Sequence, residues 1–328
     1  MEYKGKHIKT LDNFILIEEI NEGEKCKDYL TIDKTTGNLY ITKSIKWNDI
    51  LDLKKVTNQI DLLNKNKDNI AYIIDVKKSK NNCYIIIEYF NGGNFKNFQN
   101  NYIIENKSQL TERFIRKAIN QIISQIIFMH KKKKLYRNIK LENIFINFDM
   151  YDNIIRNGKI PPKINYSKIQ LDNEPFTLKF GNYFHSQDFY KLEELEVQSF
   201  MSPEMAQKCK EGKNISKINE KNDIWSIGVL TYELLTGKKL FEGKNSDETY
   251  NNIINGKYSF PNNLKASKEI ISFIIDLLQY SPEKRLDFEK IRELPFLDKD
   301  YEDFNFIDLS NKKNIEIDSK EPNNNFLE

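Results

Sequence analysis

The chain has 328 residues, 39% of them hydrophobic, which is enough for the core of one two-lobed domain or two small ones. Its 51 basic and 48 acidic residues nearly balance, so the charge gives no reason to expect a nucleic-acid partner. Three cysteines without paired spacing argue against a disulfide framework or a zinc site, and no apolar run approaches the ~20 residues that span a bilayer. With no signal-peptide pattern at its start, the chain is expected to be cytoplasmic, without a membrane anchor.

The first elements in chain order are short strands. Residues 13–46 alternate apolar runs with turn signals such as Thr36-Gly37-Asn38, which predicts a small antiparallel sheet. An amphipathic helix is expected at about residues 50–64. Residues 84–90 are almost continuously apolar and end in Asn91-Gly92-Gly93, the pattern of a buried strand followed by a turn.

The later part of the chain is predicted to be helical. Residues 110–130 and 270–278 carry apolar side chains at the spacing of core-facing helices. Residues 223–237 are apolar on every face, so we expect a helix in the middle of a sizeable domain. Asn222 or Asp223 is expected to cap its start, and Gly237 to supply its left-handed end.

Two segments differ in composition from their surroundings. Residues 149–174 are rich in turn signals and predict a surface hairpin extension or a loop, which is either a partner contact or a neutral expansion. In residues 298–328 the acids outnumber the lysines, and such tails are usually solvated. Aromatic residues interrupt the acids, however, which suggests docking on the chain's own surface or on a partner.

The segment from Asp223 to Gly237 reads Asp-Ile-Trp-Ser-Ile-Gly-Val-Leu-Thr-Tyr-Glu-Leu-Leu-Thr-Gly and closely resembles the central C-lobe helix of eukaryotic protein kinases of the Ser/Thr branch. Residues 136–143, Tyr-Arg-Asn-Ile-Lys-Leu-Glu-Asn, resemble the catalytic-loop motif H-R-D-L-K-P-E-N. Residues 202–204 resemble A-P-E, and residues 281–285 resemble D-P-x-x-R. The resemblance covers about residues 13–297.

The resemblance implies an α+β, bilobal protein-kinase-like fold with a small antiparallel β-rich N-lobe and a larger helical C-lobe. It divides the chain into an N-terminal extension (1–12), an N-lobe (13–90), a C-lobe (91–297) with the insert at about 149–174, and a tail (298–328).

The nucleotide-binding stations of the family are altered. The glycine-rich loop keeps one glycine of three, and Glu22 and Glu24 place carboxylates where a triphosphate would lie, with a repulsion of about 1 to 4 kcal/mol. Asp28 replaces the apolar residue that packs on adenine. Lys43 stands where the ATP lysine should be, but Gln59 replaces its glutamate partner and cannot neutralise it.

The catalytic and metal-binding aspartates are also replaced. Asn138 occupies the place of the proton-accepting aspartate, and an amide cannot take a proton near neutral pH. The best alignment puts Asn182 at the first position of D-F-G, while a rival register starts that motif at Lys179; neither supplies the carboxylate that magnesium prefers. Lys140 and Asn143 match the phosphate-contacting lysine and the metal-binding asparagine, as vestiges of a site.

The residues that assemble the fold are retained. The resemblance implies that Glu204 and Arg285 form a buried ion pair that fixes the activation segment to the C-lobe. It also implies that Asp223 holds the backbone of the catalytic loop. Arg137 remains as a potential receiver for a phosphate group.

Fold residues thus survive while catalytic residues do not, which predicts a pseudokinase that works as a binding or scaffold module, with no cofactor and with no intact catalytic or metal site. Protein partners are expected, through the insert 149–174 or the tail 298–328, and a place in a larger, for example cytoskeletal, assembly is compatible. The alternatives are an atypical Ser/Thr protein kinase and a nucleotide-binding switch, both using ATP and magnesium.

Overall fold

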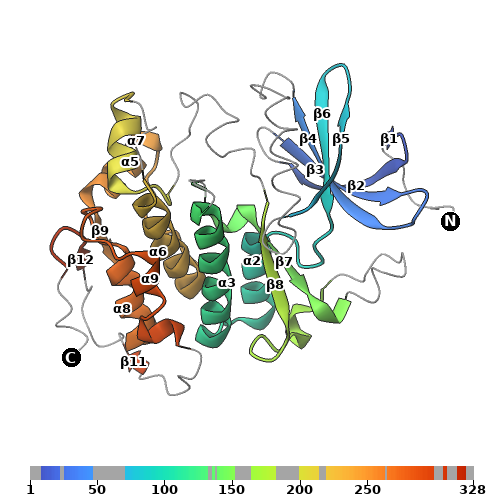
Figure 1. Cartoon of the computed structure of the whole chain (residues 1–328). Helices are drawn as coiled ribbons and strands as arrows, with labels where there is room; N and C mark the ends of the chain where they lie inside the picture. Colours follow the sequence, from blue (N-terminus) through green and yellow to red (C-terminus); the bar gives the residue numbers. More distant parts are fainter. Residues whose placement is uncertain are drawn as a thin grey trace. The chain divides into compact units, whose positions relative to one another are not determined.

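The computed structural model divides the chain into two compact units, whose elements are labelled in Figure 1. The sheet unit takes Met1–Phe98 and Glu142–Tyr190, and the helical unit takes Gln99–Leu141 and Lys191–Glu328. The structure describes residues 9–22, 26–46, 71–131, 135–136, 139–151, 164–181, 199–213, 219–262, 264–298, 306–308 and 316–322.

The sheet unit contains a six-stranded antiparallel sheet in the order β1-β2-β3-β4-β6-β5, which confirms the predicted N-terminal sheet and adds β1 ahead of it. Successive side chains of β2 alternate between two cores: Phe14 and Leu16 pack with Tyr84, while Ile15 and Ile17 join the other cluster. The strands are β1 (Lys9–Leu11), β2 (Phe14–Glu22), β3 (Cys26–Asp33), β4 (Leu39–Lys46), β5 (Ile73–Lys78) and β6 (Asn82–Glu88).

A hairpin of β7 (Ile144–Phe148) and β8 (Phe176–Phe180) belongs to the same unit. The described residues of the insert continue this hairpin through the short 3-10 turns η3 (Asp149–Tyr151) and η4 (Tyr166–Lys168). The ring of Tyr166 lies 5.7 Å from that of Phe98, which itself packs 5.2 Å from Phe148. Aromatic packing therefore holds the described end of the insert against the hairpin.

The helical unit is built around α6 (Lys221–Thr236), in which every residue from 222 to 236 is buried. The prediction of a central, fully buried helix is confirmed, as are the helices predicted at 110–130 and 270–278. The other helices of this unit are α3 (Glu112–Lys131), α5 (Pro203–Lys210), α7 (Ser246–Asn255), α8 (Lys268–Leu277) and α9 (Phe288–Ile291), with the 3-10 turn η7 (Pro295–Leu297). Helix α2 (Phe95–Asn106) and the 3-10 turn η2 (Leu141–Asn143) each contain residues of both units.

The ends of α6 agree with the sequence in one case and differ in the other. Gly237 adopts the left-handed conformation with φ 71°, and its N–H donates to Glu233 O, as predicted. The predicted cap at Asn222 or Asp223 is wrong, because α6 begins at Lys221, ahead of both residues. Glu220 occupies the N-cap position, and its side chain makes no capping hydrogen bond. The side chains of Asn222 and Asp223 bind partners outside the helix instead.

Gly228 allows α6 to pack closely on α8. A Cβ atom at Gly228 would lie 2.9 Å from Leu278 Cδ2 and 3.0 Å from Leu277 Cβ. We expect Gly228→Ala to lower the free energy of unfolding by about 1 to 3 kcal/mol through this overlap, although alanine is the better helix former. Urea denaturation measures the change, and an unchanged midpoint would mean that the two helices separate without loss.

The C-terminal part of the chain adds strands to the helical unit. β11 (Phe306–Asp308) pairs with β10 (Lys265–Ser267), and β12 (Glu316–Asp318) pairs with β9 (Lys257–Ser259), both antiparallel. The described residues of the tail therefore lie on the chain's own helical unit. Among the helices that the structure describes, none is both long and apolar enough to cross a bilayer.

Candidate functional site

Lys43 forms a buried ion pair with Asp28 inside the sheet unit. The antiparallel register of β3 and β4 places the two residues directly opposite each other. Lys43 Nζ lies 2.9 Å from both carboxylate oxygens of Asp28, and the two side chains are only 2% and 8% exposed. The lysine that the sequence analysis matched to the ATP lysine thus has a counter-charge on the neighbouring strand.

The sequence analysis missed this pair. It treated Asp28 as a substitution that disfavours adenine and assigned Gln59 as the polar neighbour of Lys43. Gln59 lies outside the described residues. The signal was present in the sequence as an acid and a lysine on consecutive strands, but pairing them required the register of β3 against β4.

Aromatic side chains lie on the other side of Lys43. Its Nζ is 5.4 Å from the ring centroid of Phe145 on β7, within the range of a cation–π contact. Phe145 stacks on Phe90 at 5.0 Å with an interplanar angle of 26°, and both rings are buried. Gly181 packs against the same ring, since a Cβ there would lie 2.3 Å from Phe145 Cε2. Among the described residues, the Lys43 ammonium therefore contacts the Asp28 carboxylate and the ring of Phe145, which is itself packed on Phe90.

Asn143, matched to the metal-binding asparagine, ends η2 and is 2% exposed. Its backbone carbonyl accepts a hydrogen bond of 2.8 Å from the N–H of Gly181, directly after β8. Lys179 lies inside β8, where its Nζ contacts both carboxylate oxygens of Glu88 at 2.9 Å. The rival register would place D-F-G at the end of this strand, while Asn182, where the other register starts the motif, lies outside the described residues, so the choice between the two registers stays a prediction.

Lys140, matched to the phosphate-contacting lysine, belongs to the helical unit. Its Nζ lies 5.8 Å from the ring centroid of Phe200. Arg137 and Asn138 lie outside the described residues, so their predicted roles stay predictions.

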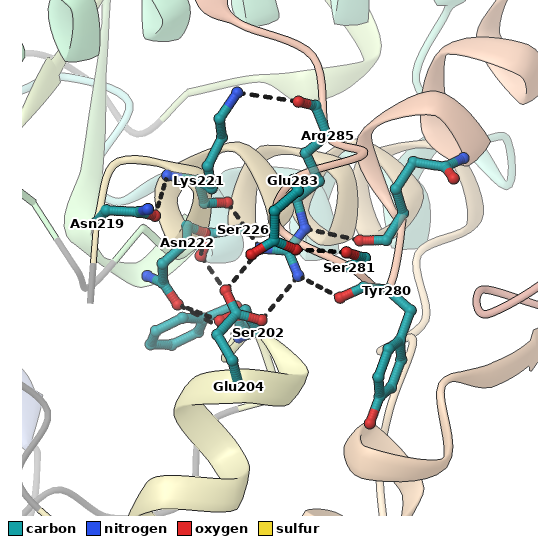
Figure 2. Close-up of polar contacts among 12 residues, drawn as sticks. Ser202, Glu204, Asn219, Lys221, Asn222, Ser226, Tyr280, Ser281, Glu283 and Arg285 are labelled. Carbon is teal, nitrogen blue, oxygen red and sulfur yellow. Dashed lines mark hydrogen bonds and ion pairs between the residues drawn. The ribbon is translucent and has the colours of Figure 1, made fainter. Parts of the chain in front are cut away.

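The guanidinium of Arg285 is the centre of a polar network in the helical unit (Figure 2). We call this network, which includes the pair with Glu204, the Arg285 anchor. The guanidinium makes a bidentate pair with Glu204 at 2.7 and 2.8 Å, at the start of α5. Its other N–H groups donate to the backbone carbonyls of Gln279, Lys221 and Tyr280 at 2.7, 3.0 and 2.9 Å. All five donors of the guanidinium are thereby engaged, and the side chain is fully buried.

A second set of bonds ties residues 200–202 to α6 (Figure 2). The Ser202 hydroxyl donates to Asn222 Oδ1 at 2.8 Å, and the Ser226 hydroxyl donates to the carbonyl of Phe200 at 2.9 Å. The segment that resembles A-P-E is therefore held by side chains of α6 and by Arg285. These polar residues replace solvent as bonding partners in the middle of the unit.

Asp223 lies in the first turn of α6 and is fully buried. Its Oδ2 accepts a hydrogen bond of 3.2 Å from the backbone N–H of Tyr136, the first residue of the segment that resembles the catalytic loop. The same oxygen lies 2.7 Å from His130 Nε2 at the end of α3, and since a carboxylate only accepts, the proton is on that nitrogen. Burial and, next, the Asp223 carboxylate raise the pKa of Tyr136, so its phenol stays neutral.

Comparison with known proteins places this arrangement in a family. The protein kinase domain model matches residues 14–297. Myosin light chain kinase 2, skeletal/cardiac muscle, of Rattus norvegicus is 26% identical over 270 residues, covering 81% of this chain and 39% of that protein. The probable serine/threonine protein kinase IRE4 of Arabidopsis thaliana is 25% identical over 299 residues, covering 84% of this chain and 26% of that protein.

A solved structure has the same fold. The crystal structure of Rad53 residues 1–466 in complex with AMP-PNP aligns with a TM-score of 0.61 at 21% identity, over 87% of this chain and 66% of that one. The chain spans about two fifths or less of the length of the two relatives named above. Since the family model covers most of its residues, the chain belongs to the protein kinase domain family.

Proposed function

We propose that this chain is a pseudokinase, a kinase-like domain with impaired phosphoryl transfer that works as a protein-binding or scaffold module. The observation that carries the proposal is the buried ion pair in which Lys43 Nζ contacts both oxygens of Asp28 at 2.9 Å. In the family this lysine contacts the phosphates of ATP and pairs with a helix glutamate. A lysine already bound to Asp28 must give up that pair before it can hold a phosphate.

Giving up the pair is unfavourable. The Asp28 side chain is 8% exposed, so its carboxylate would lose the Lys43 ammonium at 2.9 Å while staying shielded from solvent. It would also repel an incoming triphosphate by about 1 to 4 kcal/mol at short range. Both effects oppose nucleotide binding at Lys43.

The replaced aspartates support the same proposal. Asn138 stands where the family has its proton acceptor, and Asn182 where it has a magnesium ligand. A neutral amide neither takes the proton of an alcohol nor holds magnesium as a carboxylate does. We therefore propose that the domain works without a bound cofactor.

The second candidate is an atypical Ser/Thr protein kinase, or a nucleotide-binding switch without catalysis. The retained residues Lys43, Lys140 and Asn143 favour it, as do the kinases among the relatives. Either activity would need ATP with magnesium held by ligands other than the family aspartates.

The proposed scaffold role implies protein partners. The insert 149–174 and the tail 298–328 are the segments proposed to contact them, within the cytoplasm and as part of a larger assembly. Affinity purification of the full chain, compared with a variant that lacks residues 164–174 of the insert, tests this part of the proposal by the proteins that co-purify with each.

A thermal-shift titration with ATP tests the proposal directly. We expect the melting temperature of the full chain to stay unchanged up to millimolar ATP, with or without magnesium, because Lys43, which would bind the phosphates, is already paired with Asp28. A ligand present at 100 times its dissociation constant would stabilise the fold by about 2.7 kcal/mol, which is a shift of several degrees. A magnesium-dependent rise would support the second candidate.

A phosphate-transfer assay separates the two forms of that candidate. Label incorporated from ATP into the chain or into a mixed Ser/Thr peptide library, and lost in Lys140→Ala, would establish an active kinase. Lys140 is the better control, because replacing Lys43 leaves Asp28 without its partner and alters stability as well as chemistry. A thermal shift without label transfer would establish a switch.

A further inference from the structure

Strand β12 binds the edge of β9 as a short peptide would bind a strand-addition site. The antiparallel register places Ile317 opposite Tyr258, and the Ile317 side chain is 2% exposed. Strand addition supplies backbone hydrogen bonds, while pockets for alternate side chains supply selectivity. Ile317 is thus the apolar anchor of the docked segment.

The residue that follows β12 is held by two further backbone bonds. The N–H of Ser319 donates to Gly256 O, and its carbonyl accepts from the N–H of Tyr280, both at 3.0 Å. Gly256 has φ 70°, and a Cβ there would lie 2.2 Å from Ser319 Oγ. The site therefore requires glycine on the receiving side and a small residue at position 319 of the segment.

The charged residues around these bonds contribute unequally. Lys320 Nζ lies 4.9 Å from the ring centroid of Tyr280, a cation–π contact. Glu316 and Lys257 are 3.8 Å apart and more than half exposed, so their attraction adds little. Recognition rests on the backbone, on Ile317 and on the small residue at 319, within a segment that reads acidic, isoleucine, acidic, serine, lysine in this chain.

One buried group weakens the docked state. The hydroxyl of Ser319 is buried and, within the described residues, has no hydrogen-bond partner. Burying an unsatisfied hydroxyl is unfavourable. A segment of five residues with such a group is held at a modest strength, which suits a ligand that can exchange.

Tyr280 connects this segment to the Arg285 anchor. Its N–H donates to Ser319 of the tail, while its carbonyl accepts from Arg285 Nη2 at 2.9 Å. The same guanidinium binds Glu204 at the start of α5 (Figure 2). Displacing the tail removes the hydrogen bond of the Tyr280 N–H. The backbone of Tyr280, whose carbonyl accepts from Arg285, is then less firmly held.

We propose that β9, Gly256 and Tyr280 form a peptide-binding site for an extended acidic–isoleucine–acidic–serine–lysine segment. Residues 316–320 of this chain are its resident ligand. Occupancy of the site steadies the Glu204–Arg285 anchor and, through it, residues 200–210. The proposal goes beyond the scaffold role and holds whether or not the chain transfers phosphate.

A peptide-binding experiment on the full chain tests the site. Ile317→Asp places a charge in the apolar position and releases the tail. A fluorescent peptide of residues 313–322 is expected to bind this variant at least tenfold more tightly than the unaltered chain, whose own tail competes at a high effective concentration. The same peptide carrying Ile317→Asp serves as the matched control and should not bind.

Hydrogen exchange tests the connection to the anchor. Backbone amides of residues 200–210 are expected to exchange at least tenfold faster in Ile317→Asp and to return towards the original rate when the peptide saturates the site. Equal peptide binding by both chains, binding by neither, or unchanged exchange in a folded variant would overturn the proposal.

A second variant keeps the test decisive if Ile317→Asp does not fold. Ser259 and Glu316 are register partners, so Ser259→Cys/Glu316→Cys in a Cys209→Ser background is expected to close a disulfide that fixes the tail. Residues 200–210 should then exchange more slowly in the oxidised than in the reduced chain. Failure to close, or equal exchange in both forms, would refute tail docking or its connection to the anchor.

Discussion

Lys43→Met and Asp28→Val are each expected to lower the free energy of unfolding by about 3 to 5 kcal/mol. Each substitution leaves one charge without its partner in a site where the two side chains are 2% and 8% exposed. The site is shielded from solvent, so water does not make up for the lost bonds of 2.9 Å between Nζ and the carboxylate. Urea denaturation of the full chain, followed by circular dichroism, measures the loss.

The double variant Lys43→Met/Asp28→Val is expected to have a free energy of unfolding within about 1 kcal/mol of that of the unaltered chain, because it removes both charges of the pair together. A matched control exists in the same sheet: Lys27 and Glu19 are 3.3 Å apart but 44% and 35% exposed. A double-mutant cycle on Lys27 and Glu19 should give an interaction free energy below about 1 kcal/mol. If the effects of the two substitutions on the free energy of unfolding added up for the buried pair as they should for this exposed pair, the main support for the pseudokinase proposal would be lost.

Arg285→Met should also lower the free energy of unfolding by about 3 to 5 kcal/mol, here in the helical unit. It removes the partner of Glu204 and five hydrogen bonds from a fully buried side chain. Glu204→Gln should lose less, about 1 to 3 kcal/mol, because residue 204 is 25% exposed and an amide oxygen still accepts one bond.

Trp225 offers a local signal for this experiment, since its ring lies 5.0 Å from the Arg285 guanidinium. Fluorescence in a Trp47→Phe background follows the anchor without the second tryptophan. Glu283→Gln is the matched control, because Glu283 is exposed and its carboxylate accepts a hydrogen bond from the Ser281 hydroxyl. Its midpoint should not change, and a loss equal to that of Arg285→Met would mean that the anchor is not the source of the effect.

The two pairs place acidic partners at different kinds of position. Glu204 and Arg285 occupy positions that the family uses to assemble its fold, and in this chain they are bonded to each other. Lys43 occupies a position that the sequence resemblance assigns to phosphate binding, and in this chain it is bonded to Asp28. The proposed loss of phosphoryl transfer is thus linked to a gain of structural role for Lys43.

Local patterns were sufficient for much of the fold. The apolar residues of α6 cover every face of the helix, so its burial followed from the letters alone, and Gly237 marked its end because only glycine readily adopts the left-handed conformation. The strands of the N-terminal sheet and the helices α3 and α8 followed from periodicity. The ordered motifs also predicted that Asn138 and Asn182 replace family aspartates, and both residues lie outside the described part of the chain.

Contacts between distant residues were decided by the tertiary structure. Asp28 meets Lys43 only because β3 and β4 pair in one register, and a shift of one residue would turn one of them to the other face. His130 reaches Asp223, and Ser319 reaches Gly256 and Tyr280, across long separations in sequence. The sequence by itself determined the N-terminal sheet and the helices α3, α6 and α8, and it predicted which acids are missing, because periodicity and motifs are local. Which charges neutralise each other, and where the tail binds, depended on strand register and helix packing, which no local pattern specifies.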